Sequence, residues 1–190
     1  MGYHLLWCPT LFFYVRMKKS VSFLLSLIFS LVAFAEKLED RYVMKTIDSG
    51  QLYFVVPYDI PSLTAKTKAL SADITYLTIS DSVTMNLSVW SADELMTDSI
   101  VLTGTNQIVI RDFKTFFIEK DKKLWLHRYS LRYPLTSFVN LYANTNPFTI
   151  DVCFGSQCIT YGYAPKQWKK EQEWMNQILH IIVTNKRIYN

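Results

Sequence analysis

An alternation of apolar and polar residues with a period of two runs through most of this chain and constrains its fold more than any other feature. In residues 83–90 (VTMNLSVW), Val, Met, Leu and Val occupy every second position. Successive side chains of a β-strand point to opposite faces, so this pattern is typical of a strand with one buried face. With residues 74–79 (ITYLTI), the segment predicts the clearest hairpin of the chain.

The apolar residues of this hairpin predict its register. We expect Leu77 and Ile79 to face the same core as the second strand. Pairing Ile79 with Val83 satisfies this expectation and requires an odd number of residues in the turn. In the same register Leu77 pairs with Met85, so a connection of three or five residues is predicted.

Similar patterns, separated by turns that contain Gly, Asn, Asp or Lys, predict further strands. Candidate segments for these strands are residues 42–47, 51–56, 99–102, 107–110, 115–119, 124–133, 136–142, 148–154 and 157–163. Pro57 and Pro61 are expected to end the strand at 51–56, because proline cannot donate to a sheet ladder. Residues 91–97 are expected to add one helical turn capped by Ser91.

The period changes near the C-terminus, where apolar residues recur at helical spacing: Trp168, Met175, Ile178, Leu179 and Ile182. This pattern predicts an amphipathic helix from about 165 to 186, and Pro165 suits its first turn. A meander of hairpins must bury one face and protect its edges. We therefore predict a mainly β fold, an antiparallel β-sandwich or partly closed barrel of about eight or nine strands with one C-terminal amphipathic helix.

Residues 17–35 (MKKSVSFLLSLIFSLVAFA) have the features of a secretory signal peptide. Two lysines precede a short apolar core, and Ala33 and Ala35 occupy the positions that a signal peptidase reads, so cleavage is predicted after Ala35. The apolar core is shorter than the roughly 20 residues that a membrane-spanning helix needs. Residues 1–16 are interpreted as an upstream extension from a misassigned start codon; a signal anchor retained in the membrane is the alternative.

The charge balance changes once this leader is removed. The chain has 20 Lys and Arg against 16 Asp and Glu, but three of the basic residues precede the cleavage site, which leaves 17 against 16. A nearly neutral chain does not favour nucleic-acid binding, which uses clustered Lys and Arg. Residues 36–190 contain no linker or repeat, so we predict a single mature β-rich domain without a stable membrane span.

Cys153 and Cys158 are predicted to form a disulfide. A two-residue type II′ turn at Gly155 and Ser156 places the two cysteines directly opposite each other, within disulfide reach. Such a bond persists in an oxidising compartment, which agrees with export. The odd thiol, Cys8, lies in the part of the chain that is expected to be removed.

One face of the strand at 124–133 is a candidate binding surface, formed by Trp125, His127, Tyr129 and Tyr133. If these rings are exposed, they would stack on sugars or contact a partner protein. If they are buried, they belong to the core, as aromatic residues of strands commonly do. The opposite face becomes polar only after Leu126, so the sequence leaves both alternatives open.

The sequence contains no recognisable motif for catalysis, metal binding or nucleotide binding. The mature chain has two histidines, His127 and His180, and shows no G-x-S-x-G motif, zinc-ligand spacing or Gly-rich phosphate loop. No pair of carboxylates stands out for glycoside hydrolysis either. We therefore assign no catalytic, cofactor-binding or metal-ligating residue and expect no cofactor.

These observations favour an exported binding or structural domain of the bacterial cell envelope, periplasmic or secreted. Its ligand is expected to be a glycan, a lipid or an envelope protein. The alternative is a secreted hydrolase with a carboxylate or hydroxyl site that the sequence does not reveal. A binding domain would expose an aromatic patch, whereas an enzyme would present a pocket with converging carboxylates or His127.

Overall fold

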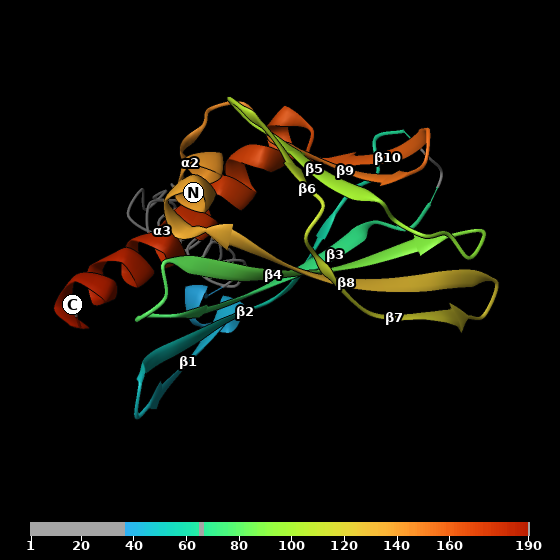
Figure 1. The fold of residues 1–190 in the computed structure, drawn as a ribbon. Coiled ribbons are helices and arrows are strands. Elements are labelled where there is room, and N and C mark those ends of the chain that lie inside the picture. Colours follow the sequence, from blue (N-terminus) through green and yellow to red (C-terminus); the bar gives the residue numbers. More distant parts are fainter. Residues whose placement is uncertain (1–36, 65–66, 190) are drawn as a thin grey trace, which may run out of the picture. The chain divides into compact units, whose positions relative to one another are not determined.

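The period-two segments fold into two antiparallel sheets (Figure 1). The structure is a computed structural model that describes residues 37–64 and 67–189. The expected extension (1–16), the signal peptide (17–35) and the cleavage site after Ala35 lie outside the described residues. The described residues from Leu38 onward form one compact unit.

The larger sheet has six strands in the order β1-β2-β3-β4-β8-β7. In chain order they are β1 (Tyr42–Ile47), β2 (Gly50–Ile60), β3 (Leu70–Leu77), β4 (Ser82–Ser91), β7 (Lys114–Asp121) and β8 (Leu124–Pro134). At the centre, β4 and β8 pair along their whole length, from Ser82 opposite Pro134 to Ser91 opposite Trp125. This register places the odd-numbered residues of both strands on the inner face of the sheet.

The smaller sheet has four strands in the order β10-β9-β5-β6. They are β5 (Ser99–Thr103), β6 (Gln107–Ile110), β9 (Thr149–Phe154) and β10 (Gln157–Gly162). This sheet covers part of the inner face of the larger one, because the ring of Phe154 in β9 lies against the ring of His127 in β8, with centroids 6.1 Å apart. Neither sheet closes on itself, so the arrangement of the described residues is sandwich-like rather than a barrel.

Helices α2 and α3 pack on other parts of the inner face. η1 (Leu38–Arg41) precedes β1, α2 (Leu135–Ala143) follows β8, and α3 (Pro165–Tyr189) ends the described chain. In the first half of α3, the ring of Trp174 packs edge-on against Tyr58 of β2, with centroids 5.6 Å apart. In the last turns of α3, the Asn185 side chain donates to the hydroxyl of Tyr53. The predicted C-terminal helix is therefore confirmed, and it packs across the sheet.

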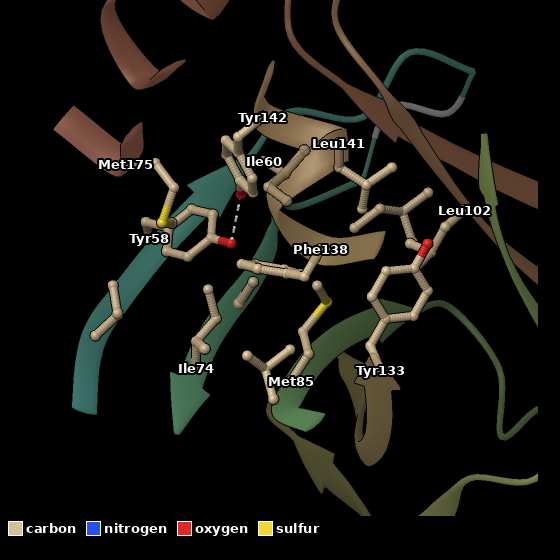
Figure 2. Close-up of a cluster of buried hydrophobic side chains, with 14 of the residues drawn as sticks. Tyr58, Ile60, Ile74, Met85, Leu102, Tyr133, Phe138, Leu141, Tyr142 and Met175 are labelled. Atoms are coloured by element: carbon tan, nitrogen blue, oxygen red, sulfur yellow. Dashed lines mark hydrogen bonds between the residues drawn. The ribbon is translucent and has the colours of Figure 1, made fainter. Parts of the chain in front are cut away.

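The core is rich in aromatic side chains (Figure 2). The hydroxyls of Tyr58 and Tyr142 lie 2.9 Å apart and share a hydrogen bond. Phe138 of α2 is fully buried and contacts Tyr133 edge-on, with centroids 6.3 Å apart. Burial raises the pKa of Tyr76 to about 12, so its phenol stays neutral well into the alkaline range. Each such ring stabilises the fold by roughly 1.5–3 kcal/mol through burial.

The hairpin of β3 and β4 has a different register from the predicted one. Ile74 pairs with Met85, so the even-numbered residues of β3 face the core, while Ile79 is 58% exposed. The reason is Tyr76, whose ring is buried while its hydroxyl donates to the carbonyl of Ser80 in the turn (3.1 Å). Residues 78–81 connect the strands, so the connection has four residues rather than three or five.

Strand β2 continues through Pro57, which was expected to end it. Its register against β3 shifts between Val55 and Tyr58, so Pro57 lies in a β-bulge. A bulge leaves a residue out of the ladder, so the missing N–H of proline costs no interstrand hydrogen bond. The described chain has ten strands rather than eight or nine.

Residues 136–142 form helix α2 and not the predicted strand. Their β-branched and aromatic residues favour a strand locally, but burial decides the outcome. The buried residues of α2 recur at helical spacing: Leu135, Phe138, Leu141 and Tyr142. The helical turn expected at 91–97 is absent as well, because Ser91 belongs to β4.

Candidate functional site

The candidate binding surface on β8 is part of the core. His127 and Tyr129 are fully buried, Tyr133 is 2% exposed and Trp125 is half-buried. Thr97 lies just before β5, and its hydroxyl donates to the hydroxyl of Tyr129 (2.6 Å). The prediction of a stacking surface is therefore wrong, because these rings fill the interior instead of facing solvent. The alternative, that they are core residues, is correct for His127, Tyr129 and Tyr133.

Burial brings together a serine and a histidine that the sequence does not link. Ser91 Oγ at the end of β4 lies 2.7 Å from His127 Nε2, and it donates to the carbonyl oxygen of Asp93 (2.5 Å). Ser91 is 4% exposed and His127 is fully buried. We call Ser91, Asp93 and His127 the closed cluster. A serine beside a histidine is one half of the arrangement with which many hydrolases activate a nucleophile.

The hydrogen bonds of the closed cluster run in the wrong direction for that chemistry. Because the only proton of the Ser91 hydroxyl goes to Asp93, the proton shared with His127 must come from Nε2. A catalytic histidine would instead accept the serine proton at Nε2. Burial also lowers the pKa of His127 below its ordinary 6.5. A hydrogen bond with the Asp93 backbone and the charge of Glu94 raise this pKa, but they offset the lowering only in part. The cluster is therefore a neutral packing element.

A second polar cluster lies on the outer face of the larger sheet. Asp73 of β3 is 2% exposed and forms an ion pair with Arg128 of β8. Asn86 Nδ2 of β4 donates to Asp73 Oδ1 (2.7 Å), and Arg128 Nη1 donates to Ser88 Oγ (2.6 Å). These bonds join three neighbouring strands, and the charges of Asp73 and Arg128 neutralise each other within the cluster. No group of three His, Cys, Asp or Glu side chains in the described ranges could hold a metal ion.

An open groove lies between α2, the end of α3 and the β3–β4 connection, and we call it the α2–α3 groove. Its volume is ≈ 680 Å³. This volume falls within the roughly 300–1,000 Å³ of small-molecule sites. The residues that line it are Asp81, Pro134, Leu135, Thr136, Val139, Asn140, Val183, Lys186 and Arg187.

The position of the groove follows from how the two helices run. They are joined at one end, where Gln172 Nε2 of α3 donates to the carbonyl of Tyr142 in the last turn of α2 and to that of Asn144 just after it (both 2.7 Å). The groove lies toward the other end, at the start of α2 and the end of α3. Its lining residues follow one stripe of each helix, such as Leu135 and Val139 four residues apart.

The rim of the groove carries more positive than negative charge. Lys186 forms an ion pair with Asp81, and its hydrogen bond and charge lower the pKa of the Asp81 carboxyl. Arg187 is exposed and forms no ion pair with any described residue. Its guanidinium therefore remains able to pair with an anionic ligand.

A smaller polar cavity of ≈ 90 Å³ adjoins α2. Asn140 lines both this cavity and the groove. The buried hydroxyl of Tyr133, another lining residue, has no hydrogen-bond partner among the described residues. The cavity is large enough for water, which would satisfy this hydroxyl.

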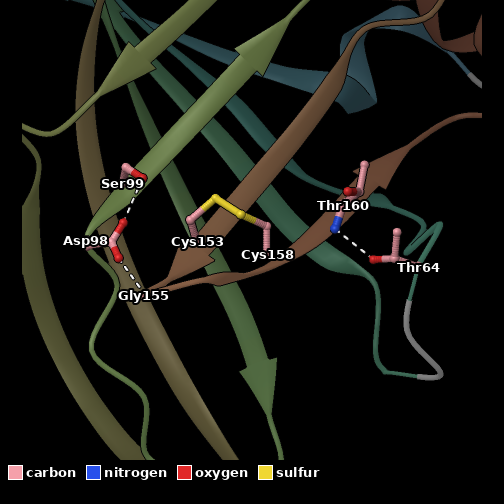
Figure 3. The surroundings of a disulfide bond; sticks show 7 residues. All are labelled: Thr64, Asp98, Ser99, Cys153, Gly155, Cys158 and Thr160. Atoms are coloured by element: carbon pink, nitrogen blue, oxygen red, sulfur yellow. Dashed lines mark hydrogen bonds between the residues drawn. A yellow bond between two sulfur atoms is a disulfide. The ribbon is translucent and has the colours of Figure 1, made fainter.

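The predicted disulfide is present (Figure 3). Cys153 and Cys158 are directly opposite each other in β9 and β10, with Cα atoms 4.1 Å apart. Gly155 has a φ of 61°, whereas Ser156 has no positive φ, as the predicted type II′ turn requires. Asp98 holds the turn, because its Oδ2 accepts a hydrogen bond from the Gly155 N–H (2.6 Å).

Sequence reasoning missed every residue of the α2–α3 groove. The missed signal is the helical spacing of Leu135, Phe138 and Leu141 directly after Pro134, a residue that favours the start of a helix. With α2 recognised, its stripe opposite the C-terminal helix would have been a candidate site. The charged residues of the rim belong to no motif and carried no such signal.

Comparison of the chain with known protein families, with curated proteins and with solved structures found no match. Across residues 37–64 and 67–189, no helix has the length and apolar character needed to cross a membrane. The function is therefore inferred from the geometry of the described residues.

Proposed function

We propose that this chain is an exported lipid-binding domain of the bacterial cell envelope, and that its α2–α3 groove takes the acyl chain of an anionic amphiphile. The observation that carries this proposal is an open groove of ≈ 680 Å³ with an aliphatic floor and a cationic rim. Leu135, Val139 and Val183 form the floor, while Lys186 and Arg187 lie beside it.

The floor favours a lipid over a glycan. Sugar sites use aromatic rings for stacking and polar groups for the hydroxyls. The described residues that line this groove include no aromatic side chain. An acyl chain would gain about 0.8 kcal/mol for each CH₂ group that it buries there. A carboxylate or phosphate head would pair with Arg187, whose planar guanidinium matches either group.

Export is supported by two features of the chain. The predicted signal peptide at residues 17–35 would direct it out of the cytoplasm. The Cys153–Cys158 disulfide suits an oxidising compartment such as the periplasm or the exterior of the cell. A periplasmic location would bring the groove close to envelope lipids.

The hydrolase alternative gains no support from the closed cluster. Ser91 and His127 are buried, and neither lines the groove or the smaller cavity. The proton between them belongs to His127, so Ser91 has no base to activate it.

A titration with fluorescently labelled dodecanoate tests this function. Val183→Asp places a carboxylate in the aliphatic floor and should weaken binding by at least about tenfold, because the buried charge opposes both the acyl chain and the anionic head. The matched control is Ile188→Asp, which adds the same charge to the same helix at a position that is 71% exposed and does not line the groove.

The control should bind dodecanoate as the wild type does. Equal affinity of all three proteins would place the ligand elsewhere and contradict the proposal. The first 36 residues are the same in all three proteins, so the difference between them reports on the groove alone.

A further inference from the structure

The outer edge of the larger sheet carries an exposed aromatic pair. Strand β7 is the edge strand next to β8 (Figure 1). Its register against β8 shifts between Thr115 and Phe117, so Phe116 is the extra residue of a β-bulge. Phe116 and Phe117 are 49% and 42% exposed. Large apolar side chains side by side at an exposed edge indicate an interaction surface, since a free edge otherwise invites aggregation.

Positive charge concentrates around this aromatic pair. Residues 111–132, which include β7 and most of β8, contain seven Lys and Arg against three Asp and Glu. The rest of residues 36–190 contains ten Lys and Arg against thirteen Asp and Glu. The expected mature chain is nearly neutral as a whole, but its positive charge is concentrated at one edge and the rest of the domain is slightly acidic.

One cation lies beside the aromatic pair, and others lie farther along the same two strands. The ammonium of Lys114 lies 5.1 Å from the ring centroid of Phe116. Lys122 and Lys123 form the exposed turn between β7 and β8, and Arg132 is exposed on β8. We call the set of Lys114, Phe116, Phe117, Lys122, Lys123 and Arg132 the basic edge. Glu119 of β7 is also exposed and offsets one of these charges.

We propose that the basic edge docks on an anionic phospholipid surface, with Phe116 and Phe117 entering the boundary between headgroups and acyl chains. Aromatic and apolar side chains flanked by Lys and Arg favour this boundary, because rings enter the apolar layer while cations remain among the phosphates. Charge complementarity selects this partner: the excess of positive charge within the domain lies in the segment that carries the exposed rings.

This proposal does not rest on the α2–α3 groove. None of the residues that line the groove belongs to the basic edge. Docking would hold the domain at a membrane whether or not the groove takes a lipid.

The test is co-sedimentation with vesicles of phosphatidylcholine alone or with about 30% phosphatidylglycerol. The wild type should bind the anionic vesicles at least about tenfold better than the neutral ones, and salt should weaken this binding. Phe116→Ser with Phe117→Ser should lower binding by about tenfold, because no ring then enters the lipid layer. Lys122→Glu with Lys123→Glu should have a similar effect through charge.

The matched control is Val43→Ser with Met44→Ser on β1, the opposite edge strand of the same sheet. Val43 and Met44 are 59% and 46% exposed, so the control removes two exposed apolar side chains without touching the basic edge. The control should bind vesicles as the wild type does. All proteins share residues 1–36, so differences between them isolate the edge.

Equal binding of neutral and anionic vesicles, or equal binding by wild type and the Phe116/Phe117 variant, would overturn the proposal. A wild type that binds no vesicles would also overturn it. The variants of the basic edge should still bind dodecanoate, and Val183→Asp should still sediment with anionic vesicles. Failure of one proposal is therefore distinguishable from failure of the other.

Discussion

The two ends of strand β8 have opposite relations to solvent. Near its start, His127 lies in the closed cluster under the smaller sheet, fully buried. At its end, Pro134 borders the α2–α3 groove, which is open. The closed end holds a serine and a histidine, the residue types with which many hydrolases activate a nucleophile. The open end holds aliphatic residues and surface charges that match no motif. Access to solvent, more than residue type, is therefore the criterion by which we propose a site in this domain.

Truncating a side chain at the closed end should lower the free energy of unfolding more than truncating an exposed side chain. His127→Ala should lower the free energy of unfolding by about 3 kcal/mol, because it leaves a cavity between two packed sheets. His180→Ala, an exposed histidine of α3, should change it by less than about 0.5 kcal/mol. Urea denaturation measures both values. A loss of less than about 1 kcal/mol for His127→Ala would mean that the cluster is loosely packed.

The disulfide lies in the smaller sheet, away from the groove residues. Cys153→Ser with Cys158→Ser should lower the free energy of unfolding by about 2 kcal/mol, since the bond closes a short loop. Dodecanoate binding should not change. Urea denaturation of the variant, and of the wild type under reducing conditions, should agree. A fully stable reduced protein would show that the hairpin needs no bond.

The closed end should also make the stability of the domain depend on pH. Burial lowers the pKa of His127 in the folded state, so as the pH falls below about 6.5 the unfolded chain takes up a proton first. The free energy of unfolding should therefore decrease with falling pH, by at most about 1.4 kcal/mol per unit, until the folded state is protonated too.

His127→Gln should remove this decrease between about pH 6.5 and 5. Denaturation curves at several pH values measure the slope. An unchanged slope in the variant would show that another group causes the pH dependence.

The open end should respond in binding and hardly in stability. Arg187→Gln should change the free energy of unfolding by less than about 0.5 kcal/mol, because the side chain is exposed. Its affinity for dodecanoate should fall about fivefold, the effect of losing a charge-assisted contact. Lys166→Gln removes the same charge at the start of α3 and should bind normally. Equal affinity of both variants would exclude Arg187 from the site.

The sequence predicted the parts of the fold that local patterns determine. The sandwich-like arrangement of antiparallel strands, the C-terminal helix and the disulfide between Cys153 and Cys158 all follow from residue period and turn chemistry. At the turn between β9 and β10, a glycine at position 155 was sufficient to predict the turn type, because this position needs a positive φ.

What the sequence could not predict depends on contacts between distant segments. The register of β3 depends on the carbonyl of Ser80, which accepts a hydrogen bond from the Tyr76 hydroxyl, and Pro57 is tolerated because a bulge removes it from the ladder. Helix α2 forms although its β-branched and aromatic residues favour a strand, because its apolar residues at helical spacing, such as Phe138, fill the core. The groove depends in turn on α2 and on the end of α3.

The central claim is that ligand binds in the open groove and that the closed cluster only packs. Paramagnetic broadening of backbone amide signals by a spin-labelled fatty acid tests it most directly. We expect the signals of Leu135, Val139 and Val183 to broaden on addition of the fatty acid, while those of Ser91 and His127 keep their intensity. Broadening at Ser91 and His127, with the groove signals unchanged, would contradict the claim.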